Sequence, residues 1–458
     1  MRLFRRSFPL ILAALLALPS ARAGDAEDEA AALARSAAFI RAGDFNRAIN
    51  EYSAILEHDP NNPGVYHNRG LARYTLGDIP NALADFGRAI ELNPQQAPFY
   101  QTRATVLRAL GKYREAISDL DHAIALDPKN VEATNLRAVA HLQARDFPQA
   151  VQDFTRTLEL APNMPGVNEN RASARLSQGD LKGALADADR ALQLNPKSSN
   201  AYTQRGRIQR AAGSFEPALS DFGHALLLDP RNLYAVYERG ATFAHLGRFP
   251  EALTDFNGAL ALKPDSVETL CSRARVRRDM GDLEAARSDY SRAAQLQPTS
   301  INAFLGRGSI RYLQQQWPAA YADFSVAARQ QPAQPYAWLY AWAARTRMGE
   351  GANADRELLG HLETQPLDDS SSWFMALAAY ALGKLDDHGL ADAAQSGDSN
   401  AARERVCEAC YFSGLRQLKT GHKPEALAAF RKTQELETLD FFEYGFAAAE
   451  LKALGANL

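Results

Sequence analysis

Arginine and acidic residues recur in this 458-residue sequence at a spacing that allows charge-assisted hydrogen bonding. An acidic residue follows each of nine arginines after sixteen positions. The arginines are Arg35, Arg69, Arg103, Arg137, Arg171, Arg205, Arg239, Arg273 and Arg307. The acids are Glu51, Asp85, Asp119, Asp153, Asp187, Asp221, Asp255, Asp289 and Asp323. A planar guanidinium binds a carboxylate through two parallel hydrogen bonds. The two rows therefore either grip a charged ligand or hold neighbouring segments of the chain together.

The two rows belong to a repeat of 34 residues, because three other residue types keep the same period. Prolines lie at Pro60, Pro94, Pro128, Pro162, Pro196, Pro230, Pro264, Pro298, Pro332 and Pro366. Alanines lie at Ala48, Ala82, Ala116, Ala150, Ala184, Ala218, Ala252, Ala286 and Ala320. Glycines lie at Gly43, Gly77, Gly111, Gly179, Gly213, Gly247, Gly281 and Gly349, while Arg145 and Gln315 replace the glycine in two copies. A fixed period of this length indicates a repeat architecture.

Each marker predicts one part of a helical hairpin. A glycine followed by aspartate, as at 43–44, 77–78, 179–180 and 281–282, ends one helix in a left-handed turn and caps the next helix with a carboxylate. The alanine lies midway along the second helix, where a small side chain lets two helices approach. The proline stops that helix, because it lacks an N–H and disfavours helical geometry before it. Apolar residues such as Ala82, Phe86, Ala89 and Ile90 recur at helical spacing.

The sequence resembles the tetratricopeptide repeat (TPR) family at this point. The second copy carries that family's pattern at Tyr66, Arg69-Gly70, Gly77-Asp78, Ala82, Asp85-Phe86, Ala89, Leu92 and Pro94. Nine contiguous repeats fill residues 24–334, in frames that start at Glu29, Pro63, Ala97, Val131, Pro165, Ser199, Leu233, Val267 and Ile301. The resemblance implies an all-α superhelical solenoid of antiparallel helix pairs whose first helices line a concave face.

In this hairpin the paired arginine and acid lie on different helices of one repeat. We therefore favour structural ion pairs over a ladder that grips a ligand. The pairs concerned are Arg69 with Asp85, Arg103 with Asp119, Arg137 with Asp153, Arg205 with Asp221, and Arg239 with Asp255. Removal of one partner from a buried pair costs several kcal/mol.

A ligand groove is expected at positions that vary between repeats, and the TPR resemblance places these positions on the concave side of the first helices. The candidates are Tyr74, Arg108, Arg207, Arg210, Tyr237, Arg275, Arg278 and Tyr312. Arginines three positions apart share one helix face. Such a basic cluster would attract an acidic peptide segment or a C-terminal carboxylate. The alternative is that these arginines are solvated helix residues paired with nearby acids.

Residues 1–23 have the features of a cleavable secretory signal peptide. Arg2, Arg5 and Arg6 precede the apolar stretch from Phe8 to Leu18, and 21–23 supply a small-x-small cleavage site. Removal of this segment takes four arginines away and changes the formal net charge from −3 to −7. We expect export to the periplasm, with secretion as the second choice.

No integral membrane segment is expected after signal removal, and the balanced charge excludes a general nucleic-acid binder.

Residues 335–458 form a divergent TPR-like helical module. A last repeat-like hairpin is expected at 407–440, with Gly414, Gly421, Ala426 and Phe430 in the repeat frame. Ser396 to Asn400 form a polar break before it. The module resembles bacterial envelope TPR proteins of the new lipoprotein I type. This resemblance implies peptidoglycan hydrolases, their processing protease or assembly factors as partners.

Aromatic residues cluster at the start of this module, at Tyr336, Trp338, Tyr340 and Trp342. We favour core packing between the regular array and the divergent module. The alternative is an exposed platform for a partner, because aromatics are enriched at interaction hot spots.

Motifs of known catalytic sites are absent from the sequence. It contains no H-E-x-x-H, S-x-x-K, G-x-S-x-G or P-loop pattern, and its nine histidines are scattered. Cys407 and Cys410 form a C-x-x-C motif, but on a helix of an all-α chain two buried or half-buried thiols are favoured over a redox pair. We therefore expect neither enzymatic activity nor a cofactor or metal.

These observations predict a non-catalytic scaffold or adaptor that binds other proteins in the bacterial cell envelope. The alternative is a periplasmic TPR chaperone or secretion accessory that captures acidic peptide segments. A hydrolase hidden in residues 335–458 is a third hypothesis.

Overall fold

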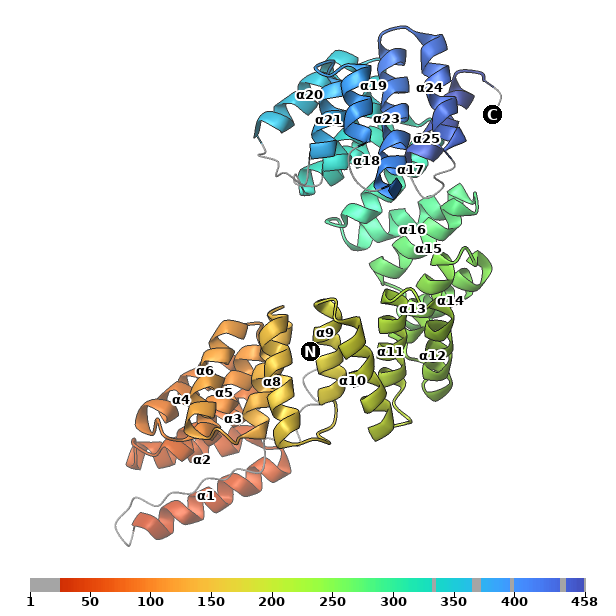
Figure 1. Ribbon diagram of the computed structural model, residues 1–458. Coiled ribbons are helices and arrows are strands. Elements are labelled where there is room, and N and C mark those ends of the chain that lie inside the picture. Colours follow the sequence, from red (N-terminus) through yellow and green to blue (C-terminus); the bar gives the residue numbers. More distant parts are fainter. Residues whose placement is uncertain (1–24, 332–334, 365–371, 396–398, 437–441, 457–458) are drawn as a thin grey trace. The chain divides into compact units, whose positions relative to one another are not determined.

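The computed structural model describes residues 25–331, 335–364, 372–395, 399–436 and 442–456. The described residues form 25 α-helices and no strand (Figure 1). The all-α prediction is therefore confirmed. The predicted signal peptide, residues 1–23, lies outside the described residues. In the described part, no helix combines the length and the apolar character needed to cross a bilayer.

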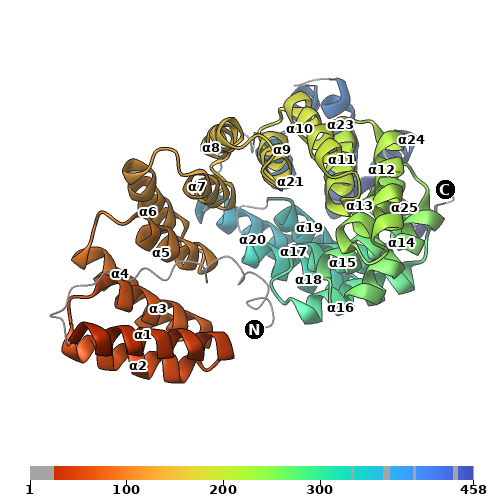
Figure 2. The ribbon, with the colours of Figure 1, turned by 90° about the horizontal axis from the view of Figure 1, so that it is seen from below.

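The chain divides into two compact units, and the first unit ends at Leu228. Its helices are α1 (Asp25–Ala42), α2 (Phe45–His58), α3 (Pro63–Leu76), α4 (Ile79–Leu92), α5 (Ala97–Ala109), α6 (Tyr113–Leu126), α7 (Val131–Gln143), α8 (Phe147–Leu160), α9 (Val167–Ser177), α10 (Leu181–Leu194), α11 (Ser199–Ala211) and α12 (Phe215–Leu228). Each odd-numbered helix pairs with the next even-numbered helix, and successive pairs are neighbours in sequence order (Figure 2).

The second unit begins at Asp229, inside the predicted array of nine repeats. Its regular repeats are formed by α13 (Leu233–His245), α14 (Phe249–Leu262), α15 (Val267–Asp279), α16 (Leu283–Leu296), α17 (Ile301–Leu313) and α18 (Trp317–Gln330). The remaining helices are α19 (Pro335–Arg347), α20 (Gly351–Thr364), α21 (Ser372–Ala381), α22 (Asp387–Ala394), α23 (Ser399–Lys419), α24 (Lys423–Glu435) and α25 (Phe442–Ala453). We call residues 335–458 the C-terminal module.

The helix boundaries follow the sequence markers. Asn62 accepts a hydrogen bond from the N–H of Val65 at the start of α3, and Gly77 ends this helix with a left-handed φ of 86°. The left-handed conformation is kept even where the turn residue is not glycine. Arg145 and Gln315 adopt φ values of 63° and 59° at the same position. Left-handed geometry is unfavourable for such residues, so the packing of the hairpin must impose it.

The predicted aspartate caps form in three of the four turns. Asp44, Asp180 and Asp282 each accept a backbone N–H of the following helix. Asp78 makes no such cap and instead accepts hydrogen bonds from the amide of Asn81. A polar side chain three residues later therefore competes with the backbone for this carboxylate.

Close helix packing within a repeat depends on a small residue opposite an aromatic ring. Gly206 on α11 faces Phe222 on α12, and a Cβ atom at Gly206 would lie 2.7 Å from that ring. The C-terminal module repeats this contact, since a Cβ atom at Gly414 would lie 2.5 Å from the ring of Phe430. In the segment 407–440, where a last repeat-like hairpin is expected, the structure has most of α23, which begins earlier at Ser399, and α24, while residues 437–440 lie outside the described residues.

The C-terminal module shares one apolar core with the last regular repeats. Tyr340 and Trp342 are buried in this core together with Phe446 from α25 and Tyr312 from α17. Core packing of the aromatic cluster is therefore confirmed for these two residues, and Tyr336 and Trp338 pack against the same core partly buried. Residues 396–398 of the predicted polar break lie outside the described residues.

Candidate functional site

The predicted arginine–aspartate pairs form in every one of the five repeats for which we named them. The shortest nitrogen–oxygen distances are 2.8 Å for Arg69–Asp85, 2.6 Å for Arg103–Asp119, 2.7 Å for Arg137–Asp153, 2.7 Å for Arg205–Asp221 and 2.7 Å for Arg239–Asp255. In each pair Nε and Nη2 of the arginine donate to the two oxygens of one carboxylate. All five aspartates are buried. Their carboxylates are thus occupied inside the repeat and are not presented to a ligand.

Some of these arginines also reach the preceding repeat. Arg137 Nη1 donates to Asp121 at 2.7 Å, and Arg205 Nη1 donates to Asp189 at 2.8 Å. Hydrogen bonds to Asp119 and Asp255 raise the pKa of Arg103 and Arg239, respectively, above the usual range. The guanidinium groups therefore stay charged at any physiological pH and tie successive hairpins together.

The groove candidates of the first unit lie on three different first helices. Tyr74 and Arg108 are half-buried on α3 and α5, and Arg108 Nη1 donates to Oε1 of Gln143 at 3.2 Å. Arg207 and Arg210 are half-buried on α11, where Arg207 Nη1 donates to Oε1 of Gln204 at 3.2 Å. None of the pockets that we describe brings Tyr74, Arg108, Arg207 and Arg210 together.

Tyr312 does not lie on a surface groove. Its side chain is fully buried, its hydroxyl donates to Oε1 of Glu450 at 2.6 Å, and Tyr411 donates to it at 2.8 Å. The prediction that Tyr312 is offered to a ligand is therefore wrong. The reason is that α25 and the C-terminal module cover the position that earlier repeats leave accessible.

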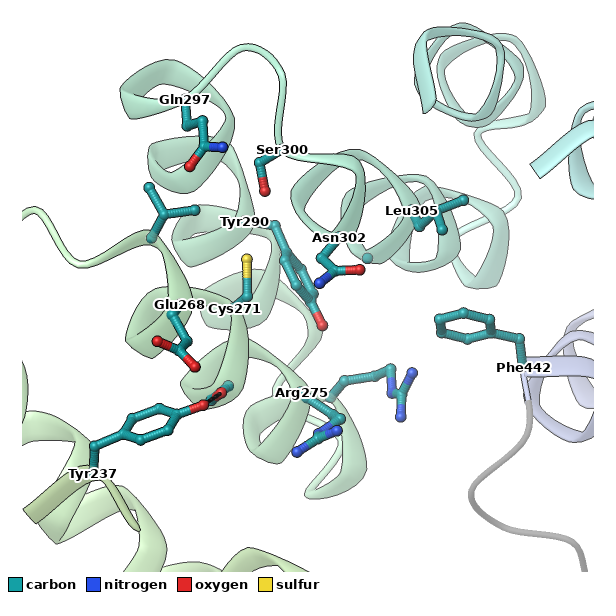
Figure 3. A pocket seen from close by; sticks show the side chains of 14 residues that line it. Tyr237, Glu268, Cys271, Arg275, Tyr290, Gln297, Ser300, Asn302, Leu305 and Phe442 are labelled. Carbon is teal, nitrogen blue, oxygen red and sulfur yellow. Dashed lines mark hydrogen bonds between the residues drawn. The ribbon is translucent and has the colours of Figure 1, made fainter. Parts of the chain in front are cut away.

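Three other candidates, Tyr237, Arg275 and Arg278, line one pocket of the second unit. We call it the α15 pocket, because α15 supplies the largest share of its wall. Its volume is about 760 Å³ (Figure 3). Volumes of 300–1,000 Å³ are usual for ligand sites. Tyr237 comes from α13, and Phe442 from α25 closes the side opposite to it (Figure 3).

The charges in the α15 pocket are unevenly balanced. Arg275 is exposed, while Arg278 pairs with Asp279 at 2.7 Å and places its guanidinium 5.1 Å from the centroid of the Phe442 ring. Glu268 is the one acidic residue among the lining side chains that the structure describes. The side chains that line the pocket therefore carry a small net positive charge, and Arg275 is its accessible part.

The remaining lining groups are neutral hydrogen-bonding or apolar groups. The hydroxyls of Tyr237 and Ser272 lie 3.1 Å apart. Burial raises the pKa of Cys271 to about 11 and that of Tyr290 to about 12. At neutral pH Cys271 is therefore a thiol and not the nucleophilic thiolate that catalysis would need.

The two cysteines of the C-x-x-C motif are not joined by a disulfide. Cys407 is buried and Cys410 is half-buried on α23. Burial raises the pKa of Cys410 above its usual value. The described residues contain no cluster of three or more metal-ligating side chains.

Sequence reasoning missed Phe442 and Tyr290 as pocket residues. Tyr290 occupies the repeat position that carries phenylalanine in several other copies, so its place in the repeat gives no sign of a pocket role. Phe442 follows α17 by more than a hundred residues and shares no period with it. No signal in the sequence connects Phe442 to α15.

Comparison with family models finds one recurrent match. A model described as tetratricopeptide repeat matches residues 102–165, 140–199, 169–223, 197–267 and 271–335. A model described as TPR repeat matches residues 38–77, and a further tetratricopeptide repeat model matches residues 63–96. A comparison with curated proteins finds no match.

Solved structures to which the chain is similar include several repeat proteins. A tetratricopeptide repeat protein from Parabacteroides merdae is 19% identical, with a TM-score of 0.45, over 52% of this chain and 94% of its own. YrrB, a TPR protein with an unusual peptide-binding site, is 25% identical, with a TM-score of 0.33, over 40% of this chain and 95% of its own. Yeast Tom70 is 16% identical, with a TM-score of 0.41, over 94% of this chain and 96% of its own.

Proposed function

Because this chain belongs to the tetratricopeptide repeat family, we propose that it is a non-catalytic scaffold or adaptor of the bacterial cell envelope that binds partner proteins at the α15 pocket. Proteins of this family generally mediate protein–protein interactions. The envelope location, the α15 pocket as the binding site and the class of partner protein are proposed in addition to this general role.

The observation that carries the proposal is the convergence of Tyr237, Arg275 and Arg278 on one pocket of about 760 Å³. Hydroxyl and amide side chains on its wall suit the backbone of an extended peptide. Arg275 suits an acidic side chain or a chain-terminal carboxylate, and the ring of Phe442 suits an apolar neighbour. The pocket therefore fits a short peptide segment that carries a negative charge.

Two sequence features support the location and the partner class. The signal-peptide features of residues 1–23 favour export. The resemblance of the C-terminal module to new lipoprotein I favours peptidoglycan hydrolases, or a protease that processes them, as partners. The exposed Arg275 also favours a second candidate, a periplasmic chaperone or secretion accessory that captures acidic segments in transit.

Affinity capture with residues 24–458 from an envelope extract tests the binding site. The test variant is Arg275→Glu, and the matched control is Arg287→Glu on α16, whose side chain pairs with Glu284 outside the pocket. A defined set of proteins that the control retains and Arg275→Glu loses supports the α15 pocket. Retention by both variants refutes it. Arg207→Glu with Arg210→Glu on α11 tests the first unit in the same way.

The identity of the captured proteins separates the two candidate functions. A few hydrolases or proteases support the adaptor, whereas many unrelated exported proteins with acidic segments support the chaperone. N-terminal sequencing of the exported chain tests the location, because cleavage after Ala23 leaves Gly24 as the first residue.

A further inference from the structure

Three glutamates that anchor the last helix are buried. Glu443 and Glu450 lie on α25 and Glu408 lies on α23, with 1%, 0% and 5% of their surface exposed. Their partners are mostly neutral donors. Tyr340 donates to Glu443 at 2.8 Å, Tyr312 donates to Glu450 at 2.6 Å, and Trp373 and Tyr336 donate to Glu408 at 2.5 and 3.1 Å. Buried carboxylates are usually matched by cations, so this arrangement is unusual.

The three carboxyl groups differ in the charges that face them. Glu450 pairs with Arg347 of α19 at 2.8 Å. Neither Glu408 nor Glu443 forms an ion pair among the contacts of the described residues, and the two face each other closely enough to interact electrostatically. Other titratable or charged groups around them are Tyr336 and Tyr340 of α19, Glu404, Arg405 and Tyr411 of α23, and Arg278 of α15. From α24, Gln434 donates its amide to the backbone oxygen of Tyr444.

Burial and the mutual repulsion of Glu408 and Glu443 favour their neutral forms. Burial, with a contribution from Glu443, raises the pKa of Glu408 to about 8, and burial raises the pKa of Glu443 as well. When α25 leaves its site, Glu443 goes with this helix into water and to a pKa near 4.5, while Glu408 on α23 loses the repulsion from Glu443 that helps to raise its pKa. The docked state therefore binds more protons than the released one, so docking weakens as the pH rises above about 4.5.

The position of these carboxyls connects them to the α15 pocket. Glu443 follows Phe442 directly in sequence, and the Phe442 ring forms the pocket wall against Arg278. Since Phe442 is the first residue of α25, release of the helix start removes this wall.

We propose that α25 is a proton-dependent latch on the α15 pocket, docked while at least one of Glu408 and Glu443 is protonated and loosened when both are ionised. This inference rests on the proposed function only in that the pocket is the site where the partner binds. The latch itself is a property of the folded chain.

Hydrogen exchange followed by mass spectrometry tests the latch on residues 24–458 without any ligand. Exchange is measured at pH 5.5 and pH 8.5 and corrected for the intrinsic pH dependence of the amides. We expect the protection of α25 to fall at least about tenfold relative to α14 of the same unit, since each pK unit corresponds to a factor of ten. Equal protection ratios at the two pH values overturn the proposal.

Two variants link the effect to the carboxyl pair. Glu443→Gln keeps an oxygen that accepts from Tyr340 but cannot ionise, so the pH dependence of α25 should be strongly reduced. Tyr340→Phe removes a donor that favours the ionised form, so the midpoint should move to higher pH. Glu425→Gln, at an exposed position of α24, is the matched control and should behave like the parent chain. An unchanged pH profile in both Glu443→Gln and Tyr340→Phe overturns the assignment to this pair.

A binding measurement separates this inference from the proposed function. A fluorescent peptide that contains Glu and Phe is titrated at both pH values with the parent chain and with Glu443→Gln. Weaker binding at pH 8.5 in the parent only supports a latch that controls the pocket. Equal binding at both pH values refutes that control. If no peptide of this class binds at either pH, the proposed site is wrong, and the exchange data still decide whether the latch exists.

Discussion

The regular repeats and the C-terminal module bury carboxylates in opposite ways. In a repeat, each buried aspartate faces an arginine sixteen residues away, and both of its oxygens accept charged N–H groups. In the module, Glu408 and Glu443 face tyrosine and tryptophan donors that lie 35 to 103 residues away. The first solution matches each buried acid with a cation, whereas the second surrounds the acid with neutral donors, and burial there raises the pKa of Glu408 and Glu443.

This difference assigns different tasks to the two regions. A local pair of opposite charges fixes the geometry of one hairpin, and the same pair recurs in each repeat. Where the hydrogen-bond donors around a buried acid are neutral, the stability of the local geometry depends on whether the acid is protonated. The repeats are therefore suited to a constant framework, and the module is suited to an adjustable end.

Breaking a repeat ion pair should have the largest effect on stability. Asp85→Asn leaves Arg69 and Arg73 without the carboxylate that both of them contact. We expect a loss of about 3 kcal/mol, as for other broken buried pairs. The urea midpoint of residues 24–458 and the local hydrogen exchange of α3 and α4 measure it. A loss below about 1 kcal/mol contradicts a structural role for the arginine row.

The two regions should respond to pH with opposite sign. Burial lowers the pKa of His67 on α3 to about 4, so the surrounding repeats lose stability as the pH falls from 6.5 towards 4. Burial raises the pKa of Glu450 to about 7, so the module loses stability as the pH rises from 4.5 towards 7. Hydrogen exchange of α3 and α25 across pH 4.5–7.5 checks both directions. His67→Gln should remove the acid-side loss in α3 and leave α25 unchanged.

The contact between a small residue and an aromatic ring should be equally sensitive in both regions. Gly206→Ala in a repeat and Gly414→Ala in the module each place a methyl group too close to a phenylalanine ring. We expect a loss of roughly 1–2 kcal/mol for each, as in other overpacked cores. Gly223→Ala on α12 is the control, because no atom lies within 4 Å of its added Cβ. The control should be stabilised by about 0.5–1 kcal/mol in thermal unfolding.

The smallest effect is expected for an ion pair on the surface of a repeat. Arg88 and Glu91 of α4 lie 3.0 Å apart, with 46% and 67% of their side chains exposed. Glu91→Gln should leave the urea midpoint almost unchanged, because exposed ion pairs contribute little to stability. A change as large as that of Asp85→Asn would remove the distinction between buried and exposed pairs.

Sequence reasoning predicted those features that recur at a fixed period. The first helices of repeats two to four begin at Pro63, Ala97 and Val131, as the 34-residue frame requires, and the arginine–aspartate pairs form between helices of one repeat. The fifth repeat deviates slightly, since its first helix begins at Val167 rather than Pro165. Local signals of capping, helix termination and apolar spacing act within about 34 residues, so a single sequence contains them in full.

The candidate site was only partly predictable, because its second half comes from non-periodic contacts. Arg275 and Arg278 were found from the pattern of variation between repeats. Tyr312 was wrongly predicted to face a ligand groove, and Phe442 was missed. Both errors have the same cause, because α25 packs back onto α17. No period or motif encodes this return of the chain, and only tertiary structure reveals which repeat positions it covers.

The hydrogen bond between Tyr312 and Glu450 can form only late in the synthesis of the chain. The two residues are 138 positions apart, so the ninth repeat emerges long before its final partner. At roughly 5–20 residues per second, the Tyr312 hydroxyl lacks Glu450 for about 7–28 s. In a nascent chain the side of α17 that α25 covers would therefore stay exposed for this interval, which is long enough for a holding chaperone to bind it before the last helix arrives.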